Sequence, residues 1–117
     1  MVYWERKDDG KHLQDDRQVR RYRRMEMVTL GKTGITVNKN GFGALPIQRI
    51  SIDDAVALAR RAYEAGMTFF DTARFYTDSE EKLGAAFEGM REKVFISTKT
   101  MAKDVEGFWK DLETSLR

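Results

Sequence analysis

The feature that most constrains the fold is a threefold alternation of short apolar runs with helical patterns. The apolar runs are GFGALP, MTFF and KVFIS, and the helical patterns that follow them span residues 51–65, 78–90 and 104–116. Short strands that are apolar on both faces and separated by amphipathic helices are typical of a parallel sheet covered by helices, with right-handed crossovers. The sequence therefore predicts an α/β fold in which parallel strands alternate with helices.

Each helical pattern begins at a capping residue and has one apolar face. Ser51 and Asp54 have the spacing of a capping box, Asp78 or Ser79 starts the second pattern, and Asp104 starts the third. The apolar positions are Ala55, Leu58, Ala59 and Ala62, then Leu83, Ala86, Phe87 and Met90, then Val105, Phe108, Trp109, Leu112 and Leu116. Because these positions recur every three or four residues, we expect three helices that each bury one side.

A hairpin and a charged extension precede these repeats. The segments MVTL, GKTG and ITVN indicate two short strands around a glycine-bounded turn. Residues 1–26 hold eight Lys/Arg and six Asp/Glu, whereas residues 27–117 hold thirteen of each, so the extension carries the whole net charge of +2. Its stretch RQVRRYRR favours a solvated, disordered arm over a nucleic-acid contact, because nearby aspartates dilute the positive field. We therefore expect a domain over residues 27–117.

The composition excludes several classes of site. The 117 residues contain no cysteine, so disulfides and thiolate chemistry are excluded, and His12 is the only histidine, so a metal site built from several histidines cannot form. No apolar run approaches the roughly 20 residues of a membrane span, and charges stand where a signal peptide has its apolar region. We expect no metal site, no membrane segment and a cytoplasmic location.

Three polar side chains follow the predicted strands, at the edge where parallel α/β folds gather functional groups. Asp71 ends the MTFF run, Tyr76 lies on the next loop, and Lys99 follows KVFIS. An ammonium near a phenol favours the phenolate, and a carboxylate paired to the ammonium keeps that charge in place. Such a phenol can protonate a carbonyl oxygen during hydride attack. The plainer alternatives are an Asp71 that binds loop amides, a Tyr76 that packs, and a Lys99 that is only a solvated cation.

The segments MVTLGKTGITV, GFGALP, FFDTARFYTDSEEKLG, KVFISTKT and DLETSLR together resemble the N-terminal part of the aldo-keto reductases, over residues 27–117. The resemblance implies a partial (β/α)8 TIM barrel with a β-hairpin across its bottom, of which the chain holds about three of eight units. It also implies NADPH as hydride donor and small-molecule aldehydes or ketones as substrates. By position it makes Tyr76 the proton donor, Lys99 its activating cation and Asp71 the residue that holds Lys99.

The same resemblance places Gly43, Ala44 and Leu45 near the cofactor, with Asp71 close to the nicotinamide ribose. The glycines of GFG, Gly41 and Gly43, have a competing explanation, which is tight packing at the end of a strand. Thr77 departs from the family pattern, because many members have glycine after the tyrosine. We expect this difference to alter the substrate pocket more than the proton donor.

A larger departure is that the family's fourth catalytic residue, a histidine, is absent up to Arg117, and His12 cannot replace it by position. An open set of strand–helix units leaves a sheet edge and one wall of the core exposed. We therefore expect a fragment that is marginally folded or self-associating through that edge, and inactive alone. Two alternatives stay open, a noncatalytic binding or assembly fragment and a nucleic-acid contact through the arginine-rich arm.

Overall fold

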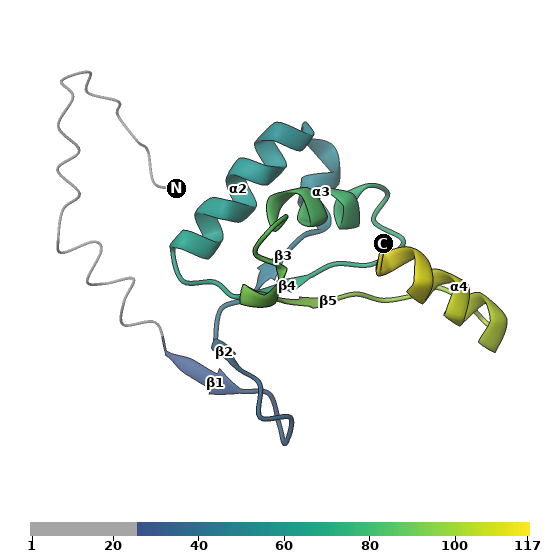
Figure 1. Ribbon diagram of the computed structural model, residues 1–117, viewed down its shortest axis with the longest axis horizontal. Helices are drawn as coiled ribbons and strands as arrows, with labels where there is room; N and C mark the ends of the chain where they lie inside the picture. The colour runs from purple at the N-terminus through teal and green to yellow at the C-terminus, as the bar shows by residue number, and fades with distance from the viewer. Residues whose placement is uncertain (1–25) are drawn as a thin grey trace, which may run out of the picture.

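The computed structural model describes residues 26–117 (Figure 1). Residues 1–25 of the predicted extension, which include the arginine-rich stretch 17–24, lie outside the described residues. The elements in chain order are β1 (Met27–Thr29), β2 (Thr36–Asn38), β3 (Phe42–Gly43), η1 (Leu45–Arg49), α2 (Ile52–Glu64), β4 (Phe69–Asp71), α3 (Ser79–Ala86), η2 (Arg91–Lys93), β5 (Phe95–Ser97) and α4 (Val105–Ser115), where η marks 3₁₀ turns. This order confirms the predicted hairpin followed by three strand–helix units.

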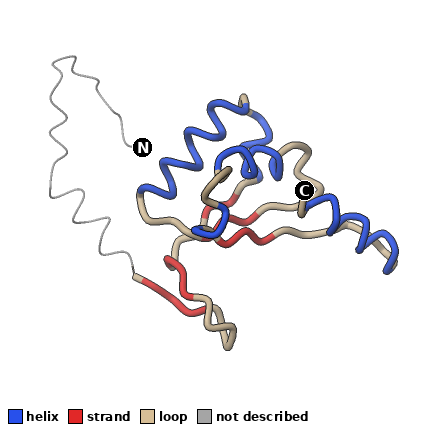
Figure 2. The backbone as a smooth tube through the Cα atoms, in the orientation of Figure 1, coloured by secondary structure: helices blue, strands red, loops and turns tan. Residues whose placement is uncertain are grey.

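The central sheet has the order β3-β4-β5, and both of its pairings are parallel (Figure 2). Its register aligns Gly43 with Asp71 and Asp71 with Ser97, so these three residues form one row across the C-terminal edge of the sheet. The hairpin β1-β2 is antiparallel and forms a separate small sheet. Glu26 is already part of it, because its carbonyl oxygen accepts a hydrogen bond from the Lys39 amide at 2.9 Å.

Helix α2 begins and ends where its sequence predicts. The Ser51 hydroxyl accepts a hydrogen bond from the Asp54 amide at 3.1 Å, which satisfies one of the free N–H groups of the first turn. After Glu64 the chain leaves the helix through Gly66, whose φ of +97° is readily adopted only by glycine. The capping residue and the glycine stop are thus confirmed.

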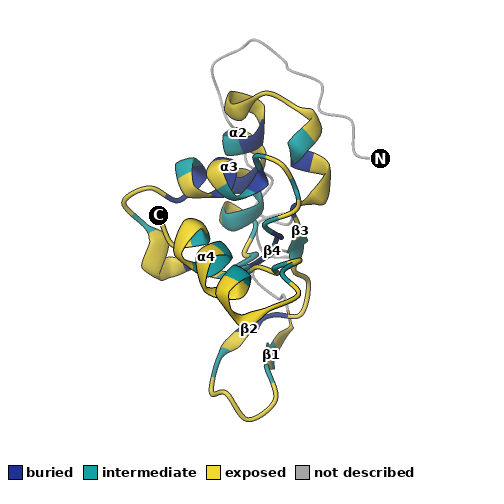
Figure 3. Cartoon of the chain, turned by 90° about the vertical axis from the view of Figure 1, so that its right-hand side faces the viewer, coloured by how far each residue is buried: buried dark blue, intermediate teal, exposed yellow. Residues whose placement is uncertain are grey.

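The core lies between the sheet and the helices α2 and α3, which Figure 3 shows with their buried residues in dark blue. Phe70 is fully buried at its centre, with ring centroids 5.3 Å from Phe42 and 4.6 Å from Phe87. The other buried core residues are Ala44, Ile47, Ala55, Ala59, Leu83, Ala86 and Val94. Burial of these side chains is what holds the two helices on the sheet.

Two predictions about the later elements are wrong. Helix α3 ends at Ala86 rather than at position 90, because Phe87 caps it and Gly89, with a φ of +73°, turns the chain. Met90 therefore packs against the core from outside the helix. Helix α4 begins after Asp104 as predicted, but it contains no buried residue, so its apolar stripe does not form a core face. Among residues 26–117, no helix is both long and apolar enough to cross a bilayer.

Candidate active site at the carboxyl edge of the sheet

Backbone hydrogen bonds continue the strand pairing beyond the ends of β4 and β5. The Thr72 amide donates to the Ser97 carbonyl at 2.8 Å, and the Arg74 amide donates to the Lys99 carbonyl at 2.9 Å. On the other side of β4, the Ala44 amide donates to the Asp71 carbonyl at 2.8 Å. The loop that carries Tyr76 therefore runs beside the segment that carries Lys99, and both leave the same edge of the sheet.

Asp71 and Lys99 form an ion pair at this edge. The Lys99 Nζ donates to Asp71 Oδ1 and Oδ2, each at 2.8 Å, and to the Thr72 carbonyl oxygen at 2.7 Å. Because an ammonium has three donors, all of them are engaged. The Ser97 hydroxyl also donates to Asp71 Oδ1 at 3.0 Å. Lys99 is thus not merely a solvated cation, although half of its side chain, 51%, is exposed.

The aromatic ring of Tyr76 lies beside this ion pair. The Lys99 Nζ lies 5.8 Å from the ring centroid, within the range of a cation–π contact. Among the described residues, no hydrogen bond joins the Tyr76 hydroxyl to Lys99. The ring is half-buried, and two turn hydrogen bonds fix its backbone, from the Tyr76 amide to the Ala73 carbonyl and from the Ser79 amide to the Tyr76 carbonyl. The structure therefore brings the three predicted residues together, with the Tyr76 ring beside the Lys99 ammonium.

Thr77, next to Tyr76, has an unusual backbone conformation. Its φ of +43° lies in the left-handed region, which is costly for a β-branched residue and easy for glycine. The Thr77 hydroxyl lies 3.3 Å from Gln48 Oε1 and 3.3 Å from Asp78 Oδ1, and it can donate to either. The family preference for glycine at this position thus has a backbone reason, and the threonine is held in place by polar contacts to η1.

The three residues predicted near the cofactor, Gly43, Ala44 and Leu45, differ in how far they are exposed. Gly43 is exposed, and a Cβ built on it would meet nothing within 4 Å, so the tight-packing explanation is wrong for Gly43. It is confirmed for Gly41, the other glycine of GFG, where a Cβ would lie 3.0 Å from the Phe69 ring. Leu45 is 45% exposed, whereas Ala44 is fully buried and its carbonyl accepts from the Ser79 hydroxyl at 3.0 Å. Gly43 and Leu45 therefore face open space, and Ala44 is part of the core.

Lys82 is a buried residue that the sequence analysis missed. Its side chain is only 5% exposed, and Nζ lies 3.1 Å from the Ile47 carbonyl, 2.7 Å from the Ile50 carbonyl and 2.8 Å from Asp78 Oδ2. It joins η1 to the first turn of α3. The hydrogen bond from Lys82 lowers the pKa of the Asp78 carboxyl below its ordinary value. The spacing of Asp78 and Lys82, four residues apart, was the available signal.

Glu80 is the second residue that the sequence analysis missed as a site residue. Its carboxylate accepts hydrogen bonds from Thr98 at 2.6 Å and from Arg74. Partial burial raises the pKa of Glu80, but interactions with Thr98, Ser115 and Arg74 outweigh that effect and hold the pKa below its ordinary value. Glu80 is therefore a charged link between α3, the Tyr76 loop and the end of β5.

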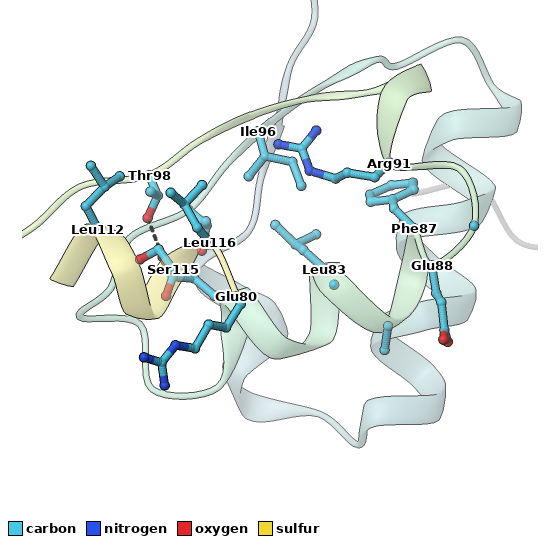
Figure 4. Close-up of a pocket in the computed structure, with 15 residues that line it drawn as sticks. Glu80, Leu83, Phe87, Glu88, Arg91, Ile96, Thr98, Leu112, Ser115 and Leu116 are labelled. Carbon is cyan, nitrogen blue, oxygen red and sulfur yellow. Dashed lines mark hydrogen bonds between the residues drawn. The ribbon is translucent and has the colours of Figure 1, made fainter. Parts of the chain in front are cut away.

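A groove of about 490 Å³ lies between α3, β5 and α4, and Figure 4 shows the side chains that line it. Leu83, Phe87, Ile96, Leu112 and Leu116 are among its apolar lining residues, and none of Asp71, Tyr76 and Lys99 belongs to it. Those three residues lie instead at the open carboxyl edge of the sheet. In α/β barrels the catalytic residues come from the ends of the strands and not from gaps between helices. Within residues 26–117, no group of three or more His, Asp or Glu side chains could hold a metal ion.

Comparisons with known proteins agree with this geometry. L-galactose dehydrogenase from Arabidopsis thaliana is 37% identical over 94 residues, which are 73% of this chain and 29% of that protein. A putative aldo-keto reductase from Pseudomonas aeruginosa superimposes with a TM-score of 0.70 and 29% identity, over 77% of this chain and 40% of that one. The aldo-keto reductase AKR11C1 from Bacillus halodurans, 23% identical, shares the fold with a TM-score of 0.70, over 80% of this chain and 36% of that one.

These neighbours are TIM barrels, so the fold is the predicted partial barrel, a three-stranded parallel sheet with its helices and N-terminal hairpin. The chain spans 29% of the length of the plant relative and 40% or less of the two solved structures. The model of the "Aldo/keto reductase family" matches residues 39–117. Since that match covers well over half of the 117 residues, and the sheet edge carries the expected polar residues, the chain belongs to the aldo/keto reductase family.

Proposed function

We propose that residues 26–117 supply the proton-donating side of an NADPH-dependent carbonyl reductase that acts on small aldehydes or ketones. The observation that carries this proposal is the ion pair of Lys99 with Asp71 under the Tyr76 ring. A cation in that place is held by two carboxylate oxygens and one carbonyl, so it stays beside the phenol. The family assignment supplies the reaction class, because aldo-keto reductases act on carbonyl compounds.

The chemistry of the three side chains follows from their contacts. When NADPH is bound, its nicotinamide supplies the hydride to the carbonyl carbon. Tyr76 donates its phenol proton to the carbonyl oxygen, where negative charge develops. Lys99 stabilises the phenolate that remains, and Asp71 keeps the ammonium from turning away into solvent. Catalytic hydrogen bonds are often long before substrate is bound, and they tighten when it binds.

The residues of the rim fit a flat cofactor ring. Gly43 has open space where a side chain would stand, and it is in register with Asp71 across one strand pair. Leu45 adds an exposed apolar surface next to it. We propose that these residues contact the nicotinamide end of NADPH, with Asp71 near the ribose, whereas Ala44 contributes through the position of its backbone.

We further propose that this chain alone turns over carbonyl substrates very slowly, and that it resides in the cytoplasm. The Asp71 and Lys99 side chains are 40% and 51% exposed, so water screens the charge that has to act on the phenol. β3 and β5 are the outer strands of the three-stranded sheet, and we propose that self-association uses these edges.

The test compares the 117-residue chain with a chimera in which residues 26–117 replace the matching segment of a full-length aldo-keto reductase. We expect the chimera to oxidise NADPH with an aldehyde panel, and the chain alone to do so at least a hundredfold more slowly. In the chimera, Tyr76→Phe should lower kcat by about 10² to 10⁴ and leave NADPH affinity unchanged. Tyr63→Phe on α2 is the control, and a Tyr76→Phe chimera with an unchanged kcat would refute the proposed proton donor.

A further inference from the structure

We propose that Glu80 is a positioning residue that fixes the Tyr76 loop against the segment that carries Lys99. This inference rests on the proposed function of those two residues, and it assigns to Glu80 a role that acts through them. Glu80 touches neither residue directly. It binds Arg74, two residues before Tyr76, and Thr98, the residue immediately before Lys99.

The contacts of Glu80 span the two segments from the helix side. One carboxylate oxygen, Oε1, accepts from the Thr98 hydroxyl at 2.6 Å, and the other, Oε2, accepts from the Arg74 guanidinium. Figure 4 shows Glu80, Thr98 and Ser115 close together beside the groove. The carboxylate therefore clamps the Tyr76 loop to the end of β5.

The hydrogen bonds of Glu80 act on the same two backbone segments whose pairing positions Lys99. The Arg74 amide donates to the Lys99 carbonyl at 2.9 Å, so the backbone of Arg74 holds the backbone of Lys99 while its side chain holds Glu80. Consecutive residues of an extended segment point to opposite sides. Thr98 thus meets Glu80 on the side of α3, and Lys99 is free to meet Asp71 on the other side. A shift of either segment would change the distance between Lys99 and Tyr76.

A carboxylate suits this place better than a neutral side chain. Glu80 is only 12% exposed and accepts from two donors, and hydrogen bonds to an ionised acceptor are about twice as strong as neutral ones. The simpler explanation is that Glu80 is one of the acidic residues that favour the first turn of any helix. Glu81 shares that turn and that charge, but it is exposed, and it is therefore the matched control.

The experiment is native-state amide hydrogen exchange by NMR on the 117-residue chain and its Glu80→Gln, Glu80→Ala, Thr98→Val and Glu81→Gln variants. We expect the Arg74 amide to exchange about tenfold faster in Glu80→Ala and several-fold faster in Glu80→Gln and Thr98→Val. The Phe95 amide, which donates to the Thr68 carbonyl inside the sheet, should keep its rate. The Lys99 side-chain resonances should shift in the Glu80 variants and not in Glu81→Gln.

Each outcome decides the proposal. Selective acceleration at Arg74 supports it, because loss of general stability would accelerate Arg74 and Phe95 together. Equal acceleration of both amides, an unchanged Arg74 rate, or the same response in Glu81→Gln would overturn it. An Arg74 amide that is unprotected in the unmodified chain would overturn it too, since no loop would then be held. The readout needs no turnover, so failure of the Tyr76 chemistry in the chimera is a separate result.

Discussion

Helices α2 and α4 have the same kind of apolar stripe, but only α2 is covered by the rest of the protein. Ala55 and Ala59 of α2 are buried in the core, whereas Val105 and Trp109 of α4 are 73% and 56% exposed. Figure 3 shows the contrast, with dark blue on α2 and α3 and mostly yellow on α4. An apolar period thus determines which side of a helix can be buried, while burial itself requires a second surface.

The local signals of the two helices are equally good. The Ser51 hydroxyl accepts from the Asp54 amide at the start of α2, and the Asp104 carboxylate accepts from the Gly107 amide at 2.8 Å at the start of α4. Capping contributes about 1 kcal/mol to either helix. Most of the stability of a helix in a protein comes from packing of its apolar face. The two regions should therefore respond very differently to the same kind of substitution.

The largest effect is expected from Phe70→Ala in the covered region. Phe70 is fully buried between the rings of Phe42 and Phe87, so its removal leaves a cavity and should lower the free energy of unfolding by about 3–5 kcal/mol. Phe108→Ala on α4 should cost less than about 1 kcal/mol, because Phe108 is 43% exposed. Urea unfolding followed by far-UV circular dichroism measures both. Equal losses would mean that α4 is covered in solution.

The next effect contrasts a buried lysine of α3, Lys82, with an exposed lysine of α4, Lys110. Lys82→Met removes the donor that reaches the Ile50 carbonyl and leaves Asp78 without its buried partner, at a cost of about 1–3 kcal/mol. Lys110→Met on the exposed α4 should change stability by less than about 0.5 kcal/mol. The same urea unfolding curves give both values. A Lys82→Met variant as stable as the unmodified chain would show that the amine is not needed to hold η1.

A smaller effect, of opposite sign in the two regions, is expected when threonine is replaced by glycine. Thr77→Gly relieves a left-handed residue and should stabilise the fold by about 0.5–1 kcal/mol, after the entropy cost of glycine. Thr114→Gly inside α4 should destabilise it by a few tenths of a kcal/mol. Thermal unfolding midpoints are the measurement. A loss of stability in Thr77→Gly would show that its polar contacts to Gln48 and Asp78 outweigh the backbone strain.

The smallest effect is the dependence of stability on pH. The lowered pKa values of Glu80 and Asp78 mean that the unfolded chain binds more protons than the folded chain in acid. Their contribution is complete above the ordinary carboxyl pKa and is lost as the pH falls from about 5 through the lowered values. Urea midpoints between pH 7 and pH 3 should fall less steeply for Glu80→Gln than for the unmodified chain. The exposed Glu113→Gln on α4 should follow the unmodified chain, and a parallel slope for Glu80→Gln would contradict the prediction.

Much of the site could be predicted from positions along the chain. Asp71 and Lys99 follow neighbouring parallel strands, and parallel strands end at one edge, so their meeting needs only the strand order. The contacts of Lys82 and Glu80 were not predictable in the same way. Both lie in α3, and their partners, Ile50 and Thr98, come from segments 32 and 18 residues away. Which side chain reaches which distant group depends on how α3 sits on the sheet.

The sequence by itself determined the order of strands and helices, the capped starts of α2 and α4, and the polar residues at the strand ends, because these depend on periodicity and on neighbours a few residues apart. Only the tertiary structure decided that α4 stays uncovered, that Glu80 and Lys82 link separate loops, and that Tyr76 meets Lys99 with its ring. The physical reason is that burial and long-range hydrogen bonds each require two segments that are distant in the sequence. A local pattern describes only one of those two segments.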